Sequence, residues 1–428
     1  MEEAEVIEEL YELQYSDLML LSSSSEEENE RQKSIISREI MEALGPTGPG
    51  LLSITGVPNV SSLRHHLLPL ARNLALLSPD HRLRILKEHN LGSDVPLKNP
   101  DRIVSSFAMQ LRYEQGLDSE QDHLDVGMMR EIQDTEFKNL GNTFRKLGFF
   151  MMDLGIRIAR ICDKAIGGQE LEQSLLESNA VKGRLIHYHS ALDNLVLKEA
   201  GRSKANGRRD GKNCTRNRQG LSKGANLDSN GNEIGSFGIH SNLWQQWHYD
   251  YGIFTVLTAP LFLSLQETQP SEECSSPSGH TYLQIFNPNK NKVCRVKAAP
   301  ESFIIQVGES ADIISKGKLR STLHSVSRPA KLDNLSRETF VVFLQPAWNK
   351  TFSISDYPMK QLMSCGQCVA VSNEETNHSE QGHNKLTQEI QKIIPPLSTR
   401  LKDGMTFAEF SRETTKQYYG GSGLQSNR

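Results

Sequence analysis

Residues 281–298, TYLQIFNPNKNKVCRVKA, contain two short apolar runs on either side of a polar turn. The turn runs from Asn287 to Asn291, and its Asn and Pro residues favour a reversal of the chain. Two runs of this kind around a short turn predict antiparallel strands joined as a β-hairpin. The second half of the chain is therefore expected to contain a β-sheet.

Further short runs of the same kind lie on both sides of the hairpin. They are rich in β-branched and aromatic residues, are separated by turn-forming residues, and cover 183–189, 251–263, 302–307, 311–315 and 337–345. Several short strands at this spacing predict an antiparallel sandwich or barrel.

Helical patterns flank this β-rich part. Residues 61–90, 129–178 and 386–418 are predicted to be helical, and GLLSITGV at 50–57 is a strand candidate. Six apolar residues at spacings of three or four share one helical face, which predicts core packing: Phe144, Leu147, Met151, Leu154, Ile158 and Ile161. We therefore expect an α+β fold, with a mainly helical region at 1–178, a β core at 179–350, and a polar linker and helix at 351–428.

A basic insertion at 201–235 interrupts the β core. Between 202 and 223 it has eight Lys or Arg residues, one acid, Asp210, and almost no apolar residues. Such a composition cannot bury enough surface to order itself, so we expect a mobile loop. The basic charge could contact phosphate. Without interleaved aromatics, however, a solvated loop or a nuclear-import patch is favoured over a nucleic-acid surface.

Composition excludes several classes of protein. The 428 residues have a net charge of -4, which is too small to imply a partner by itself. The acidic start MEEAEVIEEL is unlike a secretory signal, and no apolar run reaches the roughly 18 residues of a membrane span. The six cysteines are too sparse for a disulfide-built secreted domain. We expect a monomer in a reducing compartment, the cytoplasm with the nucleus as a second location, and no membrane partner.

The stretch His248-Tyr249-Asp250 has the character of a metal site. Alternate side chains of a strand project from one face, so His248 and Asp250 can reach the same ion. Imidazole and carboxylate are suitable ligands for Fe(II), and a second His completes a set that occupies one face of the ion. A bare His-x-Asp is a common chance match. Its significance rises because His324 follows, in the strand-like segment STLHSVSRP.

An Arg-x-Thr pair follows the second histidine. Arg337 and Thr339 share one face of the predicted strand RETFVVFLQP. The planar guanidinium group can bind a carboxylate through two parallel hydrogen bonds, and the Thr hydroxyl can donate another. The alternative is an Arg solvated at a strand edge. Together with the histidines and Asp250, the pair predicts a carboxylate-binding site beside the metal.

The order of these residues is that of a known family. HYDYGIFTVL (248–257), VKAAPESFIIQVGESADIISKGKLRSTLHSV (296–326) and SRETFVVFLQP (336–346) follow one another in the chain. They resemble the core of the plant 2-oxoglutarate- and Fe(II)-dependent oxygenases, the isopenicillin N synthase-like group. The hallmark of that family is His-x-Asp, a distal His, and then Arg-x-Ser or Arg-x-Thr. The resemblance covers about residues 180–348 and, more loosely, the N-terminal half.

The resemblance implies a double-stranded β-helix, or jelly roll, with flanking N-terminal helices and a C-terminal helix. It implies His248, Asp250 and His324 as iron ligands, and Arg337 and Thr339 as the residues that bind the distal carboxylate of 2-oxoglutarate. Dioxygen would be the other co-substrate, with ascorbate as a further candidate reductant. The implied activity couples oxidative decarboxylation of 2-oxoglutarate to hydroxylation, or a related oxidation, of a small organic substrate that the sequence does not identify.

The chain departs from the family at one predicted contact. The family strand before the metal motif often reads Asn-Tyr-Tyr-Pro, whereas here it reads His187-Tyr188-His189-Ser190. Tyr188 and His189 are therefore the candidate contacts to 2-oxoglutarate, with an imidazole in place of the second Tyr.

Two other functions remain open. One is a catalytically degenerate binding or scaffold protein, and the other is a nuclear oxygenase acting on nucleic acid or protein. Phe343 stands where the nucleic-acid demethylase branch typically has a second Arg, which argues against that branch. Separately, Cys365 and Cys368, followed by His378 and His383, could form a Cys2His2 zinc site, although the context is not that of a zinc finger.

Overall fold

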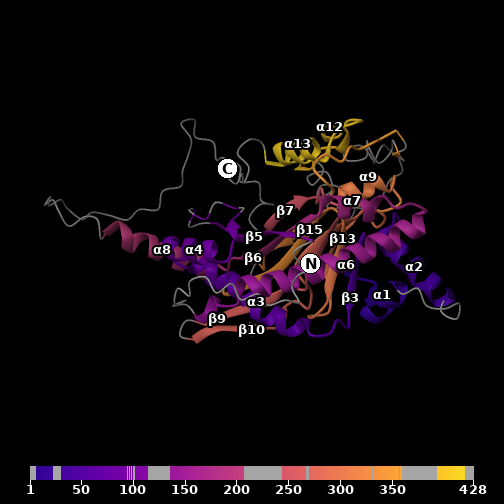
Figure 1. Ribbon diagram of the computed structural model, residues 1–428. Helices are drawn as coiled ribbons and strands as arrows, with labels where there is room; N and C mark the ends of the chain where they lie inside the picture. Colours follow the sequence, from indigo (N-terminus) through magenta and orange to yellow (C-terminus); the bar gives the residue numbers. More distant parts are fainter. Residues whose placement is uncertain are drawn as a thin grey trace, which may run out of the picture.

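The computed structural model describes residues 6–22, 30–113 (except 94, 96, 98, 100 and 101), 135–206, 243–266, 269–355 (except 330 and 331), 357–358 and 393–419. In these ranges two β-sheets and a layer of helices pack together, as Figure 1 shows. No helix in this part of the chain is long and apolar enough to cross a membrane. The candidate zinc residues 365–383 and residues 207–235 of the basic insertion lie outside the described ranges.

The larger sheet runs across the middle of the molecule. Its strands, in spatial order, are β2 (Glu12–Gln14), β3 (Leu51–Thr55), β13 (Phe303–Val307), β8 (Phe254–Thr258), β15 (Leu335–Leu344), β6 (Ala180–Tyr188), β5 (Val104–Arg112) and β4 (Gly92–Ser93). The strand β9 (Leu261–Gln266) pairs with β15 and with β10 (Gln269–Cys274). Neighbours are antiparallel except β2 and β3. The predicted strand at 251–263 is thus two strands, separated at Ala259 and Pro260.

The smaller sheet contains the predicted hairpin. Its order is β1 (Ile7–Glu9), β12 (Lys292–Lys297), β11 (Leu283–Asn287), β14 (His324–Ser327) and β7 (Leu243–His248). The hairpin is confirmed, because β11 and β12 pair antiparallel from Gln284 with Arg295 to Asn287 with Lys292.

The two sheets face each other across a shared apolar core. It takes alternate residues from both sheets, including Leu51, Ile186, Trp244, Ile285, Val296, Ile304, Val326 and Val341. Alternation along each strand sends every second side chain into this space, which is the inner face of both sheets. His248, the first residue of the predicted metal motif, ends β7, the edge strand of the smaller sheet.

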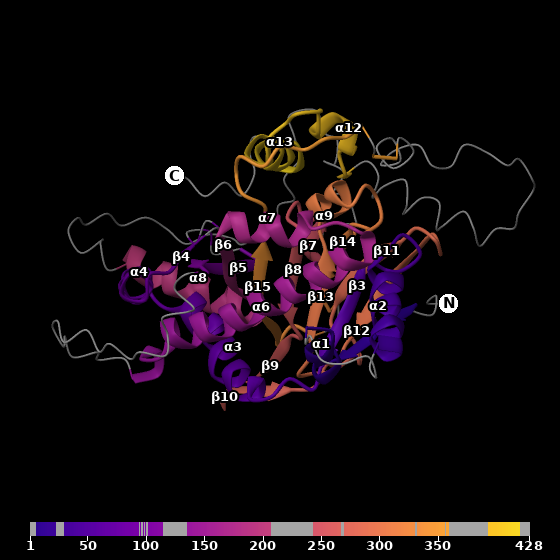
Figure 2. The same ribbon diagram turned by 45° about the vertical axis from the view of Figure 1, so that its right-hand side comes forward.

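A second core lies between the other face of the larger sheet and the helices. The helices α3 (Val60–Leu76) and α6 (Leu140–Ile166) run across this face, as Figure 2 shows. The predicted stripe on α6 is confirmed, since all six residues from Phe144 to Ile161 are buried. The other helices before β7 are α1 (Tyr15–Ser22), α2 (Glu30–Leu44), α4 (Pro79–Glu88), a 3-10 turn (Thr135–Phe137), α7 (Glu170–Ser178) and α8 (Ala191–Asn206).

Two stretches of the N-terminal region differ from the mainly helical pattern. The strands β1 and β2 come from the acidic N-terminal segment, and β5 pairs with β6 over nine residues from Val104 to Arg112. The region at 1–178 therefore supplies strands to both sheets as well as helices that pack on them. Local sequence contains little sign of this, because β1 and β2 are short and are stabilised by pairing with distant strands.

The prediction of a strand at 311–315 is wrong. It was expected to be a strand, but it belongs to the helix α9 (Glu309–Ile314). The acidic residues Glu309 and Asp312 lie in its first turn, where the helix dipole favours negative charge. The backbone amides of Glu309 and Ser310 donate to the carbonyls of Asp250 and Gly252, at 2.8 and 3.0 Å. These long-range hydrogen bonds stabilise the helix. They could not be predicted from the sequence around residue 311.

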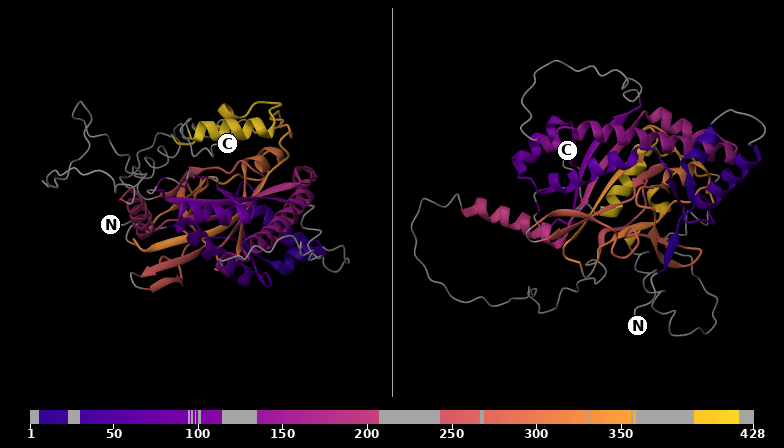
Figure 3. Two further views of the ribbon diagram at one scale, coloured as in Figure 1. Left: turned by 60° about the vertical axis from the view of Figure 1, so that its left-hand side comes forward. Right: turned by 90° about the horizontal axis from the view of Figure 1, so that it is seen from below.

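The C-terminal part packs over α9. The predicted helical segment at 386–418 contains two helices, α12 (Leu397–Arg400) and α13 (Phe407–Tyr419), while residues 386–392 lie outside the described ranges. Figure 2 and the left view of Figure 3 show these yellow helices above α9. Phe352, Phe407 and Phe410 form their own small core with Ile313 of α9.

Candidate metal centre

The structure brings the three predicted metal ligands together. His248 ends β7 and is the direct cross-strand partner of His324, which begins β14. Asp250 follows two residues after β7, with its Oδ1 3.7 Å from His248 Nε2 and its Oδ2 3.9 Å from His324 Nε2. The two imidazole rings lie 4.2 Å apart between centroids. One ligand atom from each residue lies within 4.8 Å of the others, so all three can reach one ion.

Backbone carbonyls orient the two imidazoles. The Nδ1 of His248 is 2.7 Å from the carbonyl of Gln246, and the Nδ1 of His324 is 3.0 Å from the carbonyl of Thr322. A carbonyl can only accept, so each Nδ1 would carry the hydrogen when the imidazole binds a metal through Nε2. Burial, followed by the nearby His324, lowers the pKa of His248 to about 4. His248 is therefore neutral near pH 7, the form that binds metal.

Two side chains hold the carboxylate of Asp250. The Thr255 hydroxyl donates to Oδ2 at 2.6 Å, and the Gln306 amide donates to it at 3.1 Å. The same amide nitrogen lies 3.3 Å from His324 Nε2, so Gln306 contacts two of the three ligands. Gln306 was not among the predicted site residues. Its signal is a polar side chain in the otherwise apolar strand FIIQV, which is fully buried.

The loop after the motif depends on close backbone packing. Gly308 precedes α9 and lies against the backbone of Gly252, where an added Cβ would clash with the Gly252 carbonyl oxygen. Any larger residue at 308 would push this loop away. The loop carries Asp250, so the small size of Gly308 helps to set the position of a ligand.

The predicted carboxylate-binding residues lie on the inner face of the larger sheet. Arg337 is 3% exposed, and its Nε donates to the carbonyl of Thr281 at 3.0 Å. The guanidinium group also interacts with the Tyr188 side chain, which favours its charged form. Thr339 lies two residues further along the same face, and its hydroxyl is 3.3 Å from the carbonyl of Thr258.

A chain of contacts joins Arg337 to the metal ligands. The guanidinium group lies 5.0 Å from the ring centroid of Tyr188. The Tyr188 hydroxyl donates to Gln245 Oε1 at 2.9 Å, and Gln245 Nε2 lies 3.0 Å from His248 Nε2. Tyr188 thus belongs with the predicted site, and Gln245 is a further member that the sequence did not single out.

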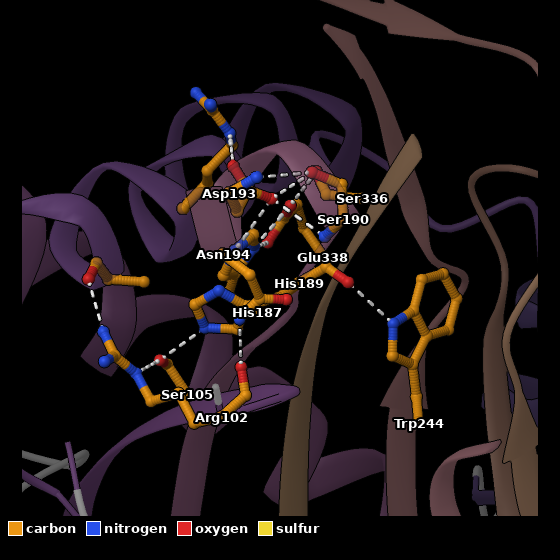
Figure 4. Close-up of polar contacts among 12 residues, drawn as sticks. Arg102, Ser105, His187, His189, Ser190, Asp193, Asn194, Trp244, Ser336 and Glu338 are labelled. Atoms are coloured by element: carbon orange, nitrogen blue, oxygen red, sulfur yellow. Dashed lines mark hydrogen bonds and ion pairs between the residues drawn. The ribbon is translucent and has the colours of Figure 1, made fainter. Parts of the chain in front are cut away.

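His189 lies on the opposite face of the sheet. Its Nε2 is 2.8 Å from the Ser105 hydroxyl, and its ring packs on that of His187. Figure 4 shows both histidines in a cluster with Asp193 and Glu338. This group shares no residue with the three predicted metal ligands. Only its backbone carbonyl turns toward the inner side, where it accepts from Trp244 Nε1 at 2.9 Å. The structure therefore brings Tyr188, but not the His189 side chain, into the predicted co-substrate site.

The C-terminal helices approach the metal motif. The Tyr418 hydroxyl of α13 accepts a hydrogen bond from the backbone amide of Tyr249 at 3.2 Å. In α12, the Arg400 guanidinium group forms two hydrogen bonds with Glu309, at 2.8 and 2.5 Å. Glu309 begins α9 and bonds Asp250 through its amide, so the ion pair joins the C-terminal helices to the ligand loop.

Solved structures with a similar fold include a complex with alpha-KG. The chain resembles a full-length Neurospora crassa protein in complex with alpha-KG and thymine, with a TM-score of 0.50 and 14% identity over 96% of this chain and 98% of that chain. It is also similar to the rice dioxygenase for auxin oxidation, at 15% identity and a TM-score of 0.48 over 93% of this chain and 98% of that chain. No family model and no curated protein matches the sequence. The similarity to the Neurospora crassa protein shows a shared fold.

Proposed function

We propose that this chain is a non-haem Fe(II)- and 2-oxoglutarate-dependent oxygenase of the isopenicillin N synthase-like group, built on a double-stranded β-helix. It would couple oxidative decarboxylation of 2-oxoglutarate to hydroxylation, or a related oxidation, of a small organic substrate. The fold shared with a protein solved in complex with alpha-KG supports the proposal.

The observation that carries the proposal is the grouping of the three predicted metal ligands at the smaller sheet, with Arg337 and Thr339 on the facing larger sheet. His248, Asp250 and His324 offer two imidazole nitrogens and a carboxylate within 4.8 Å. Arg337 and Thr339 lie on the larger sheet and face the same core. Two imidazole nitrogens and one carboxylate oxygen suit Fe(II), and such a set would leave the other side of the ion open.

Bound iron would supply the activation of dioxygen and the oxidation of the substrate. The residues of the chain have separate tasks. Gln306 and Thr255 hold the Asp250 carboxylate, while the carbonyls of Gln246 and Thr322 direct the histidine lone pairs. Outer partners of this kind fix the orientation of ligands and raise metal affinity.

Arg337 would anchor the distal carboxylate of 2-oxoglutarate. Burial lowers the pKa of its guanidinium group from the ordinary value, although the group remains a cation. A buried cation is costly unless an anion pairs with it, so a carboxylate ligand would gain a strong, water-free partner. Thr339 would donate its hydroxyl to the same carboxylate in place of its bond to Thr258.

The substrate would enter the space next to the metal ligands and below the C-terminal helices. Tyr418 of α13 contacts the backbone of Tyr249, so these helices lie close to the site. Such a cover favours a small molecule over a folded macromolecule. The cytoplasm as location and ascorbate as reductant belong to the same proposal.

The test is spectroscopic and chemical. Anaerobic addition of Fe(II) and 2-oxoglutarate to the full chain should give a weak visible charge-transfer band, and aerobic incubation should convert 2-oxoglutarate to succinate. His248→Ala and Asp250→Ala should abolish both signals. His66→Ala, at an exposed histidine of α3, is the matched control and should retain them. A wild-type protein that binds neither iron nor 2-oxoglutarate would refute the proposal.

A further inference from the structure

A second cluster of possible ligands lies on the outer face of the larger sheet. His187 is the penultimate residue of β6, His189 follows this strand, and Asp193 lies in the first turn of α8. Figure 4 shows the three side chains gathered close to one another. All three side chains are fully buried. The proposed oxygenase site uses none of them.

The geometry of this cluster matches that of the candidate iron ligands. The rings of His187 and His189 lie 4.2 Å apart, the same separation as the rings of His248 and His324. His187 Nε2 is 3.4 Å from Asp193 Oδ2. One ligand atom from each of the three residues lies within 4.8 Å of the others, as in the first group.

The two histidines differ in the partners of their ring nitrogens. His187 Nδ1 lies 2.9 Å from Glu338, and His189 Nε2 lies 2.8 Å from the Ser105 hydroxyl. His187 Nε2 lies 3.4 Å from the Asp193 carboxylate, whereas His189 Nδ1 has no hydrogen-bond partner among the described residues. Leaving a buried polar atom without a partner costs about 1–3 kcal/mol. The unpartnered His189 Nδ1, which lies beside His187 and Asp193, therefore indicates a missing partner.

We propose that His187 Nε2, His189 Nδ1 and the Asp193 carboxylate bind a second divalent metal ion, of the zinc class. Imidazole nitrogens and a carboxylate oxygen are ligands that Zn²⁺ accepts. Glu338 and Ser105 would serve as the outer partners that ligating histidines require on their other nitrogen. The ion would join β6 to α8 and so fix the strand end that carries Tyr188.

Charged and polar side chains surround the cluster and would affect its affinity for a metal ion. Arg72 donates to Asp193 Oδ1 at 2.9 Å, and Ser190 donates to Oδ2 through its amide and its hydroxyl, at 2.9 and 2.7 Å. Arg102 reaches the cluster only through the Ser105 hydroxyl, at 2.9 Å. The carboxylates of Asp193 and Glu338 provide two negative charges for the ion, while the two arginines oppose it.

A proton is the competitor of the metal. Burial lowers the pKa of His187, but the adjacent Glu338 and Asp193 outweigh it and raise the pKa to about 9. Burial, followed by the charge of His187, lowers the pKa of His189 below its ordinary value, so His189 is neutral. Without metal, His187 is therefore an imidazolium between two carboxylates. Metal binding would release this proton, because a ligating imidazole must be neutral.

The experiment uses the full chain with the other candidate metal sites removed. The background variant combines Asp250→Ala and His324→Ala with Cys365→Ser and Cys368→Ser. Zn²⁺ is titrated against a chromophoric chelator, and proton release is followed in weak buffer at about pH 7.5, below the raised pKa of His187. The expected result is one tight equivalent of Zn²⁺, about one proton released per ion, and a higher melting temperature with Zn²⁺.

Further substitutions in that background locate the ion. His189→Gln should abolish tight binding, Asp193→Asn should do the same, and Glu338→Gln should weaken binding by roughly 10–100-fold. If these variants do not fold, the Zn²⁺ stoichiometry of the background variant and its melting temperature with and without Zn²⁺ decide the question. A background variant that binds no Zn²⁺ at micromolar concentration overturns the proposal, as does binding that His189→Gln leaves unchanged. Neither result bears on the iron site, which this background already lacks.

Discussion

Arg337 lies over the ring of Tyr188, its direct partner across β15 and β6, with 5.0 Å between the guanidinium carbon and the ring centroid. The stack holds the guanidinium plane while its Nε bonds the Thr281 carbonyl. A planar group fixed on two sides loses little freedom when it binds a carboxylate. In the proposed function, the pair would provide a preformed anion site on the inner face.

Arg337→Lys tests that geometry with the charge retained. A lysine cannot form two parallel hydrogen bonds or stack as a plane, so one charge-assisted bond is lost, worth about 1.5–3 kcal/mol. We expect the KM for 2-oxoglutarate to rise about 10–100-fold, with Fe(II) affinity unchanged. Steady-state succinate production and an iron titration measure the two quantities. Thr339→Ser, which retains a hydroxyl, is the control, and equal loss of iron and 2-oxoglutarate binding would contradict the assigned role.

Gln306→Leu tests the amide that touches two ligands. Its loss leaves Asp250 with the Thr255 bond alone, so the carboxylate is less well oriented. We expect Fe(II) affinity to fall by roughly 10–100-fold, as measured by competition with a metal-binding dye. Gln284→Leu is the matched control. Gln284 lies in the smaller sheet, where it bonds Ser325 of the neighbouring strand β14, and it does not touch a predicted metal ligand. Similar losses in both variants would show that the effect is general damage to the core.

Arg400→Met tests the link between the C-terminal helices and the ligand loop. Arg400 is 1% exposed, and its removal leaves the buried Glu309 carboxylate without its cation. Breaking a buried pair in this way costs about 3–5 kcal/mol. We expect a lower unfolding free energy and faster proteolytic release of the C-terminal helices.

The double variant Arg400→Met with Glu309→Gln separates charge from packing. It removes both charges, so much of the lost stability should return in urea unfolding. A double variant no more stable than Arg400→Met alone would show that packing of the arginine, with Phe410 and Tyr418 beside it, is the main contribution.

Asp312→Asn should change how the free energy of unfolding depends on pH. Burial raises the pKa of Asp312 to about 6, and hydrogen bonds from Ser321 only partly offset this. Between the ordinary value near 3.8 and about 6, the folded state binds the proton more strongly than the unfolded state. The contribution of Asp312 to the free energy of unfolding of the wild-type protein therefore decreases as the pH rises from about 4 to about 6.

The asparagine variant lacks this titration, so its stability relative to wild type should increase between about pH 4 and pH 7, by on the order of 3 kcal/mol. Urea unfolding at several pH values measures the difference, with Asp403→Asn, at an exposed aspartate, as the control. A stability difference that is constant across the window would show that Asp312 does not titrate there.

The candidate site was partly predictable because its residues are ordered along short strands. The period of two puts Arg337 and Thr339 on one face, and the His-x-Asp spacing lets two ligands reach one point. The same period also puts Tyr188 and His189 on opposite faces. The resemblance to a family pattern had grouped these two residues, and the pairing of Tyr188 with Arg337 separates them.

Gln306, Gln245 and Glu309 could not be assigned to the site from local sequence. Each of them contacts a residue far away in the chain: Gln306 contacts His324, Gln245 contacts Tyr188, and Glu309 contacts Arg400. The helix α9 is a similar case, because carbonyls of the metal-motif loop bond its first amides. Long-range bonds of this kind override local propensity.

Local sequence was enough to predict the hairpin at 283–297 and the buried stripe of α6, which the structure confirms, and to propose a set of residues for binding a metal and a carboxylate. These follow from periodicity and side-chain chemistry, which act over a few neighbouring residues. By contrast, tertiary contacts were needed to show that His248 meets His324 across two strands, and that His187, His189 and Asp193 gather on the other side of the sheet. Strand pairing joins residues far apart in the chain, and the face on which each side chain lies depends on that register.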